Sequence, residues 1–225
     1  VPVPTLQHRI RERSARGGVC ITASHNPLEW NALKFCGADG ATLRPDQFAQ
    51  VTDLYHQGLY PWVPTDQLEE VEEDHDAMSG HLEAVLKLAD LPVVRSREFK
   101  VVIDCCNGAG SMVAPTFLRS LGCRVEEVHC DPNLPFPRSP EPLAEHLEDL
   151  CSSVVQSGAD LGLALDADAD RLALVDEKGN AIGEDCTVAL AVRYYLARDP
   201  SPVVVNLSTS RMVDAAVSYT HLRAH

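Results

Sequence analysis

Three aspartates alternate with alanines in the stretch LALDADADRLALVD. They are Asp166, Asp168 and Asp170, and the apolar runs on either side of them are typical of buried strands. Hard oxygen ligands at two-residue spacing suit Mg²⁺ or Ca²⁺, because the small residues between them let the chain fold around the ion. In an open α/β sheet, ligands bind beyond the carboxyl ends of the strands, where we expect this stretch to lie. The stretch therefore predicts a divalent-cation site, and the alternative is a solvated acidic turn without a metal.

Counting from Asp166 places Glu177 at position 12 and gives a near match to the calcium loop of an EF-hand. Position 6 is Arg171, whereas the sharp EF-hand turn requires glycine there. The flanking residues also favour strands over helices. We therefore expect no EF-hand here.

Arg171 directly follows the third aspartate. A guanidinium beside three carboxylates weakens the binding of a cation alone, but it suits a site that holds a cation and a phosphate together. The alternative is that Arg171 forms a salt bridge with the same aspartates.

A second polar cluster, ITASHNPLEW, contains Ser24. A hydrolase serine would need a G-x-S-x-G elbow and a separate histidine base, and we expect His25 to face away, because neighbours in extended chain point to opposite sides. Asn26 and Pro27 are typical of the cap and first residue of a helix, which would place backbone N–H groups near the serine. These features favour a serine that carries phosphate. The alternative is that Ser24 and Asn26 only cap a short helical turn.

The composition indicates a globular, acidic chain of 225 residues that is 45% hydrophobic. Its 33 acidic and 19 basic residues give a net charge of −14 without a segregated basic face, so we expect no nucleic-acid partner. The eight cysteines lack the spacing of a zinc site and indicate reduced thiols. No stretch reaches the ~18 apolar residues of a membrane span, and no signal-peptide pattern opens the chain. We predict a cytoplasmic protein with no membrane partner; the oligomeric state is not predicted.

Apolar periodicity predicts helices that alternate with strands. In the first part of the chain the expected elements are a helix, two strands, an amphipathic helix, a solvated acidic run and another helix, at residues 6–15, 19–22, 32–36, 48–55, 66–76 and 82–89. A boundary is expected at residues 91–98. Beyond it we predict the strands FKVVID, RVEEVHC, LGLAL and RLALV, with helices between the first three. The turn NGAG after FKVVID matches no phosphate loop, so we expect it to allow tight strand-to-helix packing.

TASHNP, followed seven residues later by Lys34, together with the distant DADADR, resembles the α-D-phosphohexomutases. This superfamily contains phosphoglucomutase, phosphomannomutase and phosphoglucosamine mutase. The resemblance extends over nearly the whole chain through VIDCCNGAGS, FPRSPEP and VVVNLSTSRMVD. The segment HNPLEWNALKF is most similar to the archaeal-type phosphoglucosamine mutase branch.

The resemblance implies an isomerase of the phosphotransferase type that interconverts hexose 6-phosphate and hexose 1-phosphate, with glucosamine phosphate favoured, through a hexose 1,6-bisphosphate. It makes Ser24 the phosphoserine that donates the phosphoryl group, Lys34 a general acid/base, and His25 and Arg171 the residues that position the phosphoryl group. It places Mg²⁺ against an oxygen of phosphorylated Ser24 and the three aspartates, Asp166, Asp168 and Asp170. Without the resemblance, Lys34 is a solvated lysine and His25 a hydrogen-bonded polar residue.

The family has four domains, and this chain resembles part of the first and most of the second. We predict an α/β protein with two α/β domains that contain mostly parallel mixed sheets, the first domain being incomplete. Residues 1–92 are expected to be domain I with the phosphoserine loop, and 93–217 domain II with the metal loop. Residues 218–225 depart from the family and show no helical or strand period. A fragment shortened at both ends is expected to bind substrate weakly and turn over slowly by itself.

Several other functions remain open at this point. The substrate could be mannose or glucose phosphate, since the loops that choose it lie outside the resemblance. A Mg²⁺-dependent phosphatase that works through an aspartate, or a noncatalytic cation-binding module, would also account for the acidic stretch. A mutase should carry an acid-stable phosphoserine, whereas a phosphatase should label an aspartate and a binding module should carry no phosphate.

Overall fold

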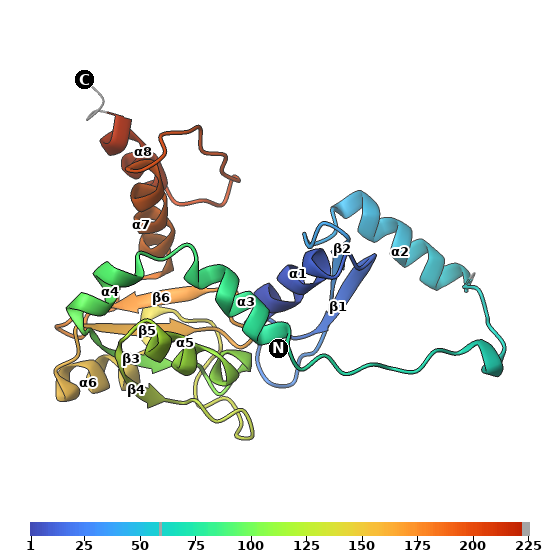
Figure 1. The fold of residues 1–225 in the computed structure, drawn as a ribbon, viewed down its shortest axis with the longest axis horizontal. Helices are drawn as coiled ribbons and strands as arrows, with labels where there is room; N and C mark the ends of the chain where they lie inside the picture. Colours follow the sequence, from blue (N-terminus) through green and yellow to red (C-terminus); the bar gives the residue numbers. More distant parts are fainter. Residues whose placement is uncertain (59, 222–225) are drawn as a thin grey trace. The chain divides into compact units, whose positions relative to one another are not determined.

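The computed structural model describes residues 1–58 and 60–221, which form two compact units (Figure 1). The first unit consists mainly of Val3–Thr22 and Asn31–Leu88. The second consists mainly of Ala23–Trp30 and the chain from Ala89 onward. The short segment that contains Ser24 therefore groups with the second unit, although it lies between two strands of the first.

The described part of the first unit contains two strands, three α-helices and one short 3-10 helix. Its elements are α1 (Val3–Glu12), β1 (Gly17–Ile21), β2 (Leu33–Gly37), α2 (Pro45–Gln57), the short η1 (Thr65–Gln67) and α3 (Ala77–Leu86). Strands β1 and β2 pair antiparallel, so the prediction of a mostly parallel sheet is wrong for the described part of this unit. The reason is the connection: residues 22–32 form turns, whereas parallel neighbours need a crossover of a dozen or more residues, usually a helix.

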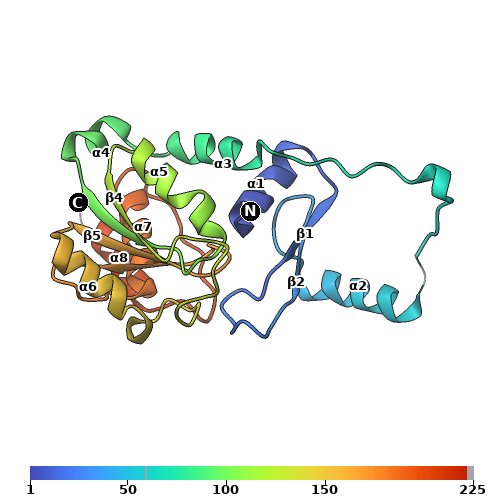
Figure 2. The ribbon, with the colours of Figure 1, turned by 90° about the horizontal axis from the view of Figure 1, so that it is seen from below.

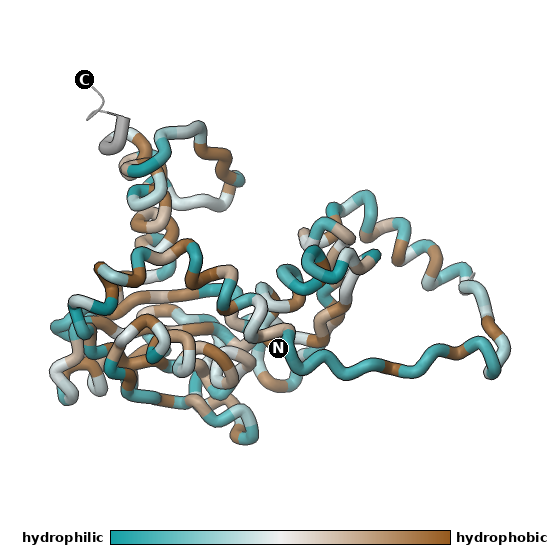
Figure 3. The backbone as a smooth tube through the Cα atoms, in the orientation of Figure 1, coloured by the Kyte–Doolittle hydropathy of each residue, from teal (hydrophilic) through white to brown (hydrophobic). Residues whose placement is uncertain are grey.

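Helices α1 and α3 pack together, and Thr5 Oγ1 lies 2.9 Å from His81 Nδ1. Helix α2 has the predicted amphipathic pattern, but none of its residues is buried. The acidic run 66–76 is exposed throughout, which confirms its predicted solvation. In Figure 3 the connection from α2 to α3 is largely hydrophilic. Arg9 holds it at one point through two hydrogen bonds to Asp74, of 2.6 and 2.9 Å.

The second unit contains the four predicted strands, β3 (Lys100–Asp104), β4 (Arg124–Val128), β5 (Leu161–Leu165) and β6 (Leu172–Val175). Their order in the sheet is β4-β3-β5-β6, as Figure 1 shows. The first two pairings are parallel, and β6 pairs antiparallel with β5. The mostly parallel mixed sheet is therefore confirmed for this unit.

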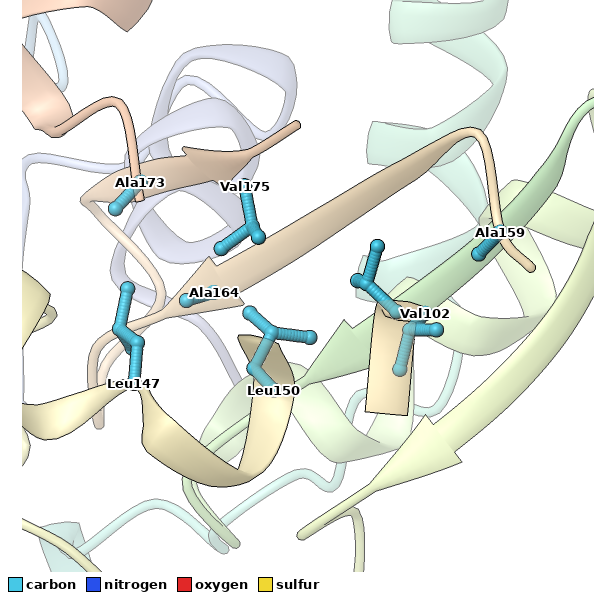
Figure 4. Close-up of a cluster of buried hydrophobic side chains, with 8 residues drawn as sticks. Val102, Leu147, Leu150, Ala159, Ala164, Ala173 and Val175 are labelled. Carbon is cyan, nitrogen blue, oxygen red and sulfur yellow. The ribbon is translucent and has the colours of Figure 1, made fainter. Parts of the chain in front are cut away.

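Alternation along β3 divides the core of the second unit into two layers. Val102 faces a cluster with α6 (Glu148–Ser157), which Figure 4 shows in close-up with Leu150 and Val175. Val101 and Ile103 face the opposite side, against α5 (Ala114–Ser120). Figure 2 shows α5 and α6 on opposite sides of the sheet. Each fully buried aliphatic side chain contributes about 1.5–3 kcal/mol to folding, so both layers hold the carboxyl ends of β3 and β5 in place.

The remaining elements of this unit are α4 (Leu91–Arg97), η2 (Ala109–Met112), η3 (Ala144–His146), α7 (Glu184–Leu196) and α8 (Met212–His221). The expected boundary at 91–98 lies just after the division between the two units at residues 88 and 89. Its residues form a short helix, because the Asp90 side chain accepts a hydrogen bond from Val93 N (3.4 Å) and Pro92 is compatible with a first turn. One prediction is corrected here. The tail predicted to lack a helical period begins inside α8, which continues through His221; the rest of it lies outside the described residues.

Among the described residues, no helix combines the length and the apolar character that crossing a membrane requires. All eight cysteines are free thiols. The cytoplasmic location stays a prediction.

Candidate active site

The three aspartates lie in the connection between β5 and β6, which we call the aspartate loop (residues 166–171). The loop begins at the carboxyl end of β5, as predicted, and leads directly into the antiparallel β6. Because both flanks are strands, the loop has no EF-hand geometry.

The aspartate loop brings its three carboxylates together. One oxygen from each lies within 4.8 Å of the others. Asp166 is fully buried, Asp168 nearly so, and Asp170 is exposed. Asp166 Oδ1 accepts hydrogen bonds from the backbone N–H groups of Asp170 (3.0 Å) and Arg171 (3.2 Å).

The second oxygen of Asp166 indicates a cation. Oδ2 is buried, and no described residue forms a hydrogen bond with it. Burial, and then the charges of Asp168 and Asp170, raise the pKa of Asp166 to about 7. A buried carboxylate oxygen without a partner is costly unless a charge of opposite sign reaches it. Two or three hard oxygens at this spacing fit Mg²⁺ or Ca²⁺, so the residues present fit a divalent cation.

The raised pKa of Asp166 predicts that the cation-free chain loses stability as the pH rises. Between about pH 4 and pH 7 the folded state keeps a proton on Asp166 that the unfolded state has released, so the free energy of unfolding falls across this range. We expect the Tm in EDTA to be about 5 °C lower at pH 8 than at pH 5 from this group. Thermal unfolding followed by circular dichroism measures it. In Asp166→Asn this part of the pH dependence should disappear; an unchanged slope in the variant would contradict the assignment.

The turn NGAG packs directly against the aspartate loop. Ala109 N donates a hydrogen bond to Ala167 O (2.8 Å). A Cβ atom at Gly108 would lie 2.4 Å from the same oxygen, and one at Gly110 would lie 2.6 Å from a methyl carbon of Leu165. These glycines do allow close packing, but their nearest neighbours are the aspartate loop and the end of β5, whereas the prediction was packing of a strand against a helix.

The alanine spacing of the loop has a local cost. Ala169 has a φ of +57°, in the left-handed region that favours glycine. An alanine there costs roughly 1 kcal/mol relative to glycine. Glycine at this position would avoid the strain, and the loop DADADR retains all three carboxylates.

The segment that contains Ser24 forms two turns, so the predicted helix start at Asn26 and Pro27 is wrong. Asn26 N donates to Ala23 O (3.1 Å) and Trp30 N to Pro27 O (3.0 Å), and the chain then continues toward β2 without room for a helix.

Ser24 and His25 lie closer together than predicted. Ser24 has a φ of +54°, which turns the chain so that its Oγ lies 3.4 Å from His25 Nδ1. The expectation that the two side chains face apart assumed extended backbone. Strained positive φ values at non-glycine residues occur preferentially at functional sites.

The other two predicted site residues are Arg171 and Lys34. Arg171 donates from Nη1 to Glu141 Oε1 (3.0 Å), so its recorded ion-pair partner is Glu141 and not the aspartates. Lys34 is half-buried on β2, opposite Cys20, in the first unit. Ser24, His25, Arg171 and the aspartates all belong to the second unit.

A cleft of about 420 Å³ opens beside the aspartate loop, within the second unit. Asp170 and Arg171 form part of its lining. Glu184 and Asp185 at the start of α7 also line it, and hydroxyl and amide side chains contribute further polar surface: Thr187, Asn206, Ser208, Thr209 and Ser210. Such a lining suits a ligand that carries hydroxyl groups.

Sequence reasoning assigned no role to Asp104 and Arg138. Asp104 ends β3 at the same edge of the sheet as Asp166, and the Arg138 side chain forms a buried ion pair with it (2.9 Å). An acidic residue at the end of a buried strand, and an arginine within the proline-rich FPRSPEP, were the available signals.

Comparison with known proteins gives matches to one enzyme family. A family model described as phosphoglucomutase/phosphomannomutase, alpha/beta/alpha domain I, matches residues 1–60, and the model for domain II of the same family matches residues 79–179. A "Probable phosphoglucosamine mutase" of Methanopyrus kandleri is 38% identical over 96% of this chain and 48% of its own length. A "Phosphoglucomutase/phosphomannomutase" of Thermococcus kodakarensis is 35% identical over 95% and 47%.

A solved structure has the same fold. The crystal structure of a candidate phosphomannomutase from Thermus thermophilus superimposes with a TM-score of 0.80 at 25% identity, over 95% of this chain and 49% of that protein. The chain thus spans about half the length of the relatives it matches. With its two domain matches, its relatives and its α/β fold in agreement, the chain belongs to the phosphoglucomutase/phosphomannomutase family.

Proposed function

We propose that this chain is the phosphoserine- and cation-bearing half of a phosphohexomutase, which interconverts hexose 6-phosphate and hexose 1-phosphate. One observation carries the proposal: the strained turn of Ser24 groups in one unit with an aspartate loop whose buried Asp166 Oδ2 has no hydrogen-bond partner among the described residues. A phosphate on Ser24 would bring the negative charge, and a cation held by the aspartates would neutralise it. Membership of the family supports this reading.

In the proposed reaction, phosphorylated Ser24 transfers its phosphoryl group to a sugar hydroxyl. The bond between Ser24 Oγ and phosphorus breaks while the sugar oxygen bonds to phosphorus, and the hydroxyl proton passes to Lys34 acting as general base. This step forms a hexose 1,6-bisphosphate. In the second step Ser24 Oγ bonds to the phosphorus of the other phosphate while the bond from that phosphorus to the sugar oxygen breaks, and Lys34 gives its proton to the sugar oxygen that is left. His25 and Arg171 hold the phosphoryl oxygens between the two steps.

The cation in this proposal is Mg²⁺, which would neutralise charge on the phosphoryl group during transfer. Asp166, Asp168 and Asp170 would hold it together with a phosphoserine oxygen on Ser24. Mg²⁺ is preferred over softer metals because every proposed ligand is a hard oxygen.

The proposed substrates are hexose phosphates and hexose 1,6-bisphosphate, with glucosamine phosphate favoured. The name of the Methanopyrus kandleri relative supports glucosamine, whereas that of the Thermococcus kodakarensis relative supports glucose and mannose. The polar cleft beside Asp170 and Arg171 is a suitable place for sugar hydroxyls.

Phosphate transfer onto Ser24 tests the proposal. We expect that incubation with glucosamine or glucose 1,6-bisphosphate and Mg²⁺ adds one phosphate, which intact-mass and peptide mass spectrometry locate on Ser24. Ser24→Ala should remain unmodified. Ser14→Ala is the matched control, because Ser14 also has a positive φ (+52°) but lies in the first unit, and it should be phosphorylated normally.

The same experiment separates the proposal from the two other classes of function. Phosphate on an acid-labile aspartate, with release of inorganic phosphate, would instead identify a phosphatase. A folded sample that binds Mg²⁺ but leaves Ser24 unmodified would favour a noncatalytic cation-binding module.

A further inference from the structure

The proline-rich loop (residues 131–142), which connects β4 to η3, contacts the residue before the first aspartate and the residue after the last one. We propose that this loop positions the cation-binding site, with Arg138 holding the beginning of the aspartate loop and Glu141 orienting Arg171 at its end. The proposal rests on the proposed function for what the site binds, but its first tests need only the free cation.

Arg138 links the proline-rich loop to two buried strands. Its side chain is 8% exposed, and Nε and Nη2 donate to the two oxygens of Asp104 at 2.9 and 3.1 Å. Nη2 also donates to the carbonyl oxygen of Leu165 at 2.9 Å. Leu165 is the last residue of β5 and directly precedes Asp166. Arg138 therefore joins the carboxyl end of β3 to the start of the aspartate loop through a planar, bidentate contact that lysine cannot reproduce.

Glu141 acts at the other end of the aspartate loop. Its Oε1 accepts the hydrogen bond from Arg171 Nη1 at 3.0 Å, and both side chains are about one-third exposed. The Glu141 carbonyl is itself held by His146 Nδ1 at 2.8 Å and by Leu143 N at 2.9 Å. A guanidinium with one nitrogen occupied by a fixed carboxylate keeps its orientation while its other N–H groups can donate to a phosphate.

The proline-rich loop is stiff enough to serve this purpose. Five of its twelve residues are prolines with fixed φ: Pro132, Pro135, Pro137, Pro140 and Pro142. Asn107 anchors it, because Nδ2 donates to the carbonyl of Pro135 (2.9 Å) and Oδ1 accepts from Asp131 N (3.0 Å). Asn107 belongs to the NGAG turn, which contacts the aspartate loop from the other side through Ala109.

The negative charges of the three aspartates explain why the aspartate loop needs contacts from outside. Three carboxylates with oxygens within 4.8 Å repel one another, so an unsupported loop would open and lose the geometry that a cation requires. Within the loop, Asp166 accepts from three backbone N–H groups, two through its side chain and one through its carbonyl. The contacts from Arg138 and Glu141 supply the constraint from outside.

The first test measures the Kd for Mn²⁺, the probe for the divalent cation, by electron paramagnetic resonance. Arg138→Lys keeps the charge but loses the bidentate contact and the bond to Leu165 O, and we expect about a 10-fold weaker Kd. Arg95→Lys is the matched control, since Arg95 also donates to a backbone carbonyl (Ser120 O, 2.9 Å) but away from the aspartate loop, and its Kd should equal that of the wild type. A folded Arg138→Lys with the wild-type Kd would overturn the role of Arg138.

The second test separates the two ends of the loop. We expect Glu141→Gln to bind Mn²⁺ within about two-fold of the wild type, yet to phosphorylate Ser24 about 10-fold more slowly at saturating cation. Glu127 on β4 forms a comparable ion pair with Arg119 of α5, and Glu127→Gln should change neither quantity. Equal transfer rates in the two glutamate variants would overturn the role of Glu141.

Hydrogen–deuterium exchange keeps the proposal testable if Arg138→Lys unfolds or if Ser24 is never phosphorylated. The N–H groups of Ala169, Asp170 and Arg171 are hydrogen-bonded, so a peptide that covers the aspartate loop should be protected in the cation-free wild type. We expect faster exchange of this peptide in Glu141→Gln and not in Glu127→Gln; identical exchange in both would count against the proposal. If Ser24 is never phosphorylated but the peptide exchanges faster in Glu141→Gln than in Glu127→Gln, the proposed function is refuted and the role of the proline-rich loop is not.

Discussion

Asp166→Asn is expected to lower the affinity for Mg²⁺ and Mn²⁺ by at least about 100-fold and to abolish detectable phosphorylation of Ser24. Asp166 is the most deeply buried of the three aspartates, and its Oδ2 has no other partner among the described residues. Asparagine has the same shape and can still accept the hydrogen bonds of Asp170 N and Arg171 N on its carbonyl oxygen, so the loop should remain folded. Titration by isothermal calorimetry measures the change.

Stability should change in the opposite direction when the cation is absent. At pH 8 in EDTA, Asp166→Asn should be more stable than the wild type, because it removes a buried and repelled charge. With Mg²⁺ at about 100 times the wild-type Kd, the wild type gains about 2.7 kcal/mol and the variant gains at most about 0.4 kcal/mol. The stability advantage of the variant should therefore shrink by about 2.3 kcal/mol on adding Mg²⁺. A wild type that Mg²⁺ fails to stabilise would show that the aspartates are not a cation site.

Gly108→Ala is expected to destabilise the second unit by about 3 kcal/mol and to weaken cation binding. The new Cβ would lie 2.4 Å from Ala167 O and 2.7 Å from Ala167 Cα, and these are backbone atoms that cannot rotate away. The φ of Gly108 is −87°, which alanine adopts freely, so the cost comes from the contact alone. Either the NGAG turn or the aspartate loop must shift, and a shift of the loop separates the carboxylates. Chemical denaturation and Mn²⁺ titration measure the two effects.

Gly158→Ala is the matched control for this prediction. Gly158 has a φ of +63°, and no atom lies within 4 Å of the position that a Cβ would occupy, so alanine there costs only left-handed strain, roughly 1 kcal/mol. Its Kd for Mn²⁺ should not change. If both variants bind Mn²⁺ as tightly as the wild type, the close contact between Gly108 and the aspartate loop has no bearing on the site.

The parts of the fold that sequence reasoning predicted well are those set by local pattern. FKVVID and LGLAL are short apolar runs of the kind found in strands buried on both faces, and they form β3 and β5 at the centre of the sheet. The three aspartates come directly after β5 in the chain, so a strand at LGLAL necessarily places them at its carboxyl end.

The errors arose where the backbone conformation depends on a few residues. A helix at Pro27 was predicted from cap and proline preferences, which are weak where the chain must return to β2 within a few residues. The orientation of His25 was predicted for extended chain, and a single positive φ at Ser24 reverses it. The parallel pairing expected in the first unit failed for the same reason, since a connection of turns returns the chain antiparallel.

By itself, the sequence determined which residues we propose for the chemistry, namely Ser24 and the three carboxylates at two-residue spacing, and the strands that flank the carboxylates, because periodicity and covalent spacing are local properties. Only the tertiary structure decided what holds them in place. Arg138 reaches Asp104 and Leu165 across 34 and 27 residues, and Glu141 reaches Arg171 across 30. Such contacts depend on the order of the strands, which places the ends of β3 and β5 side by side, and no local pattern encodes that order.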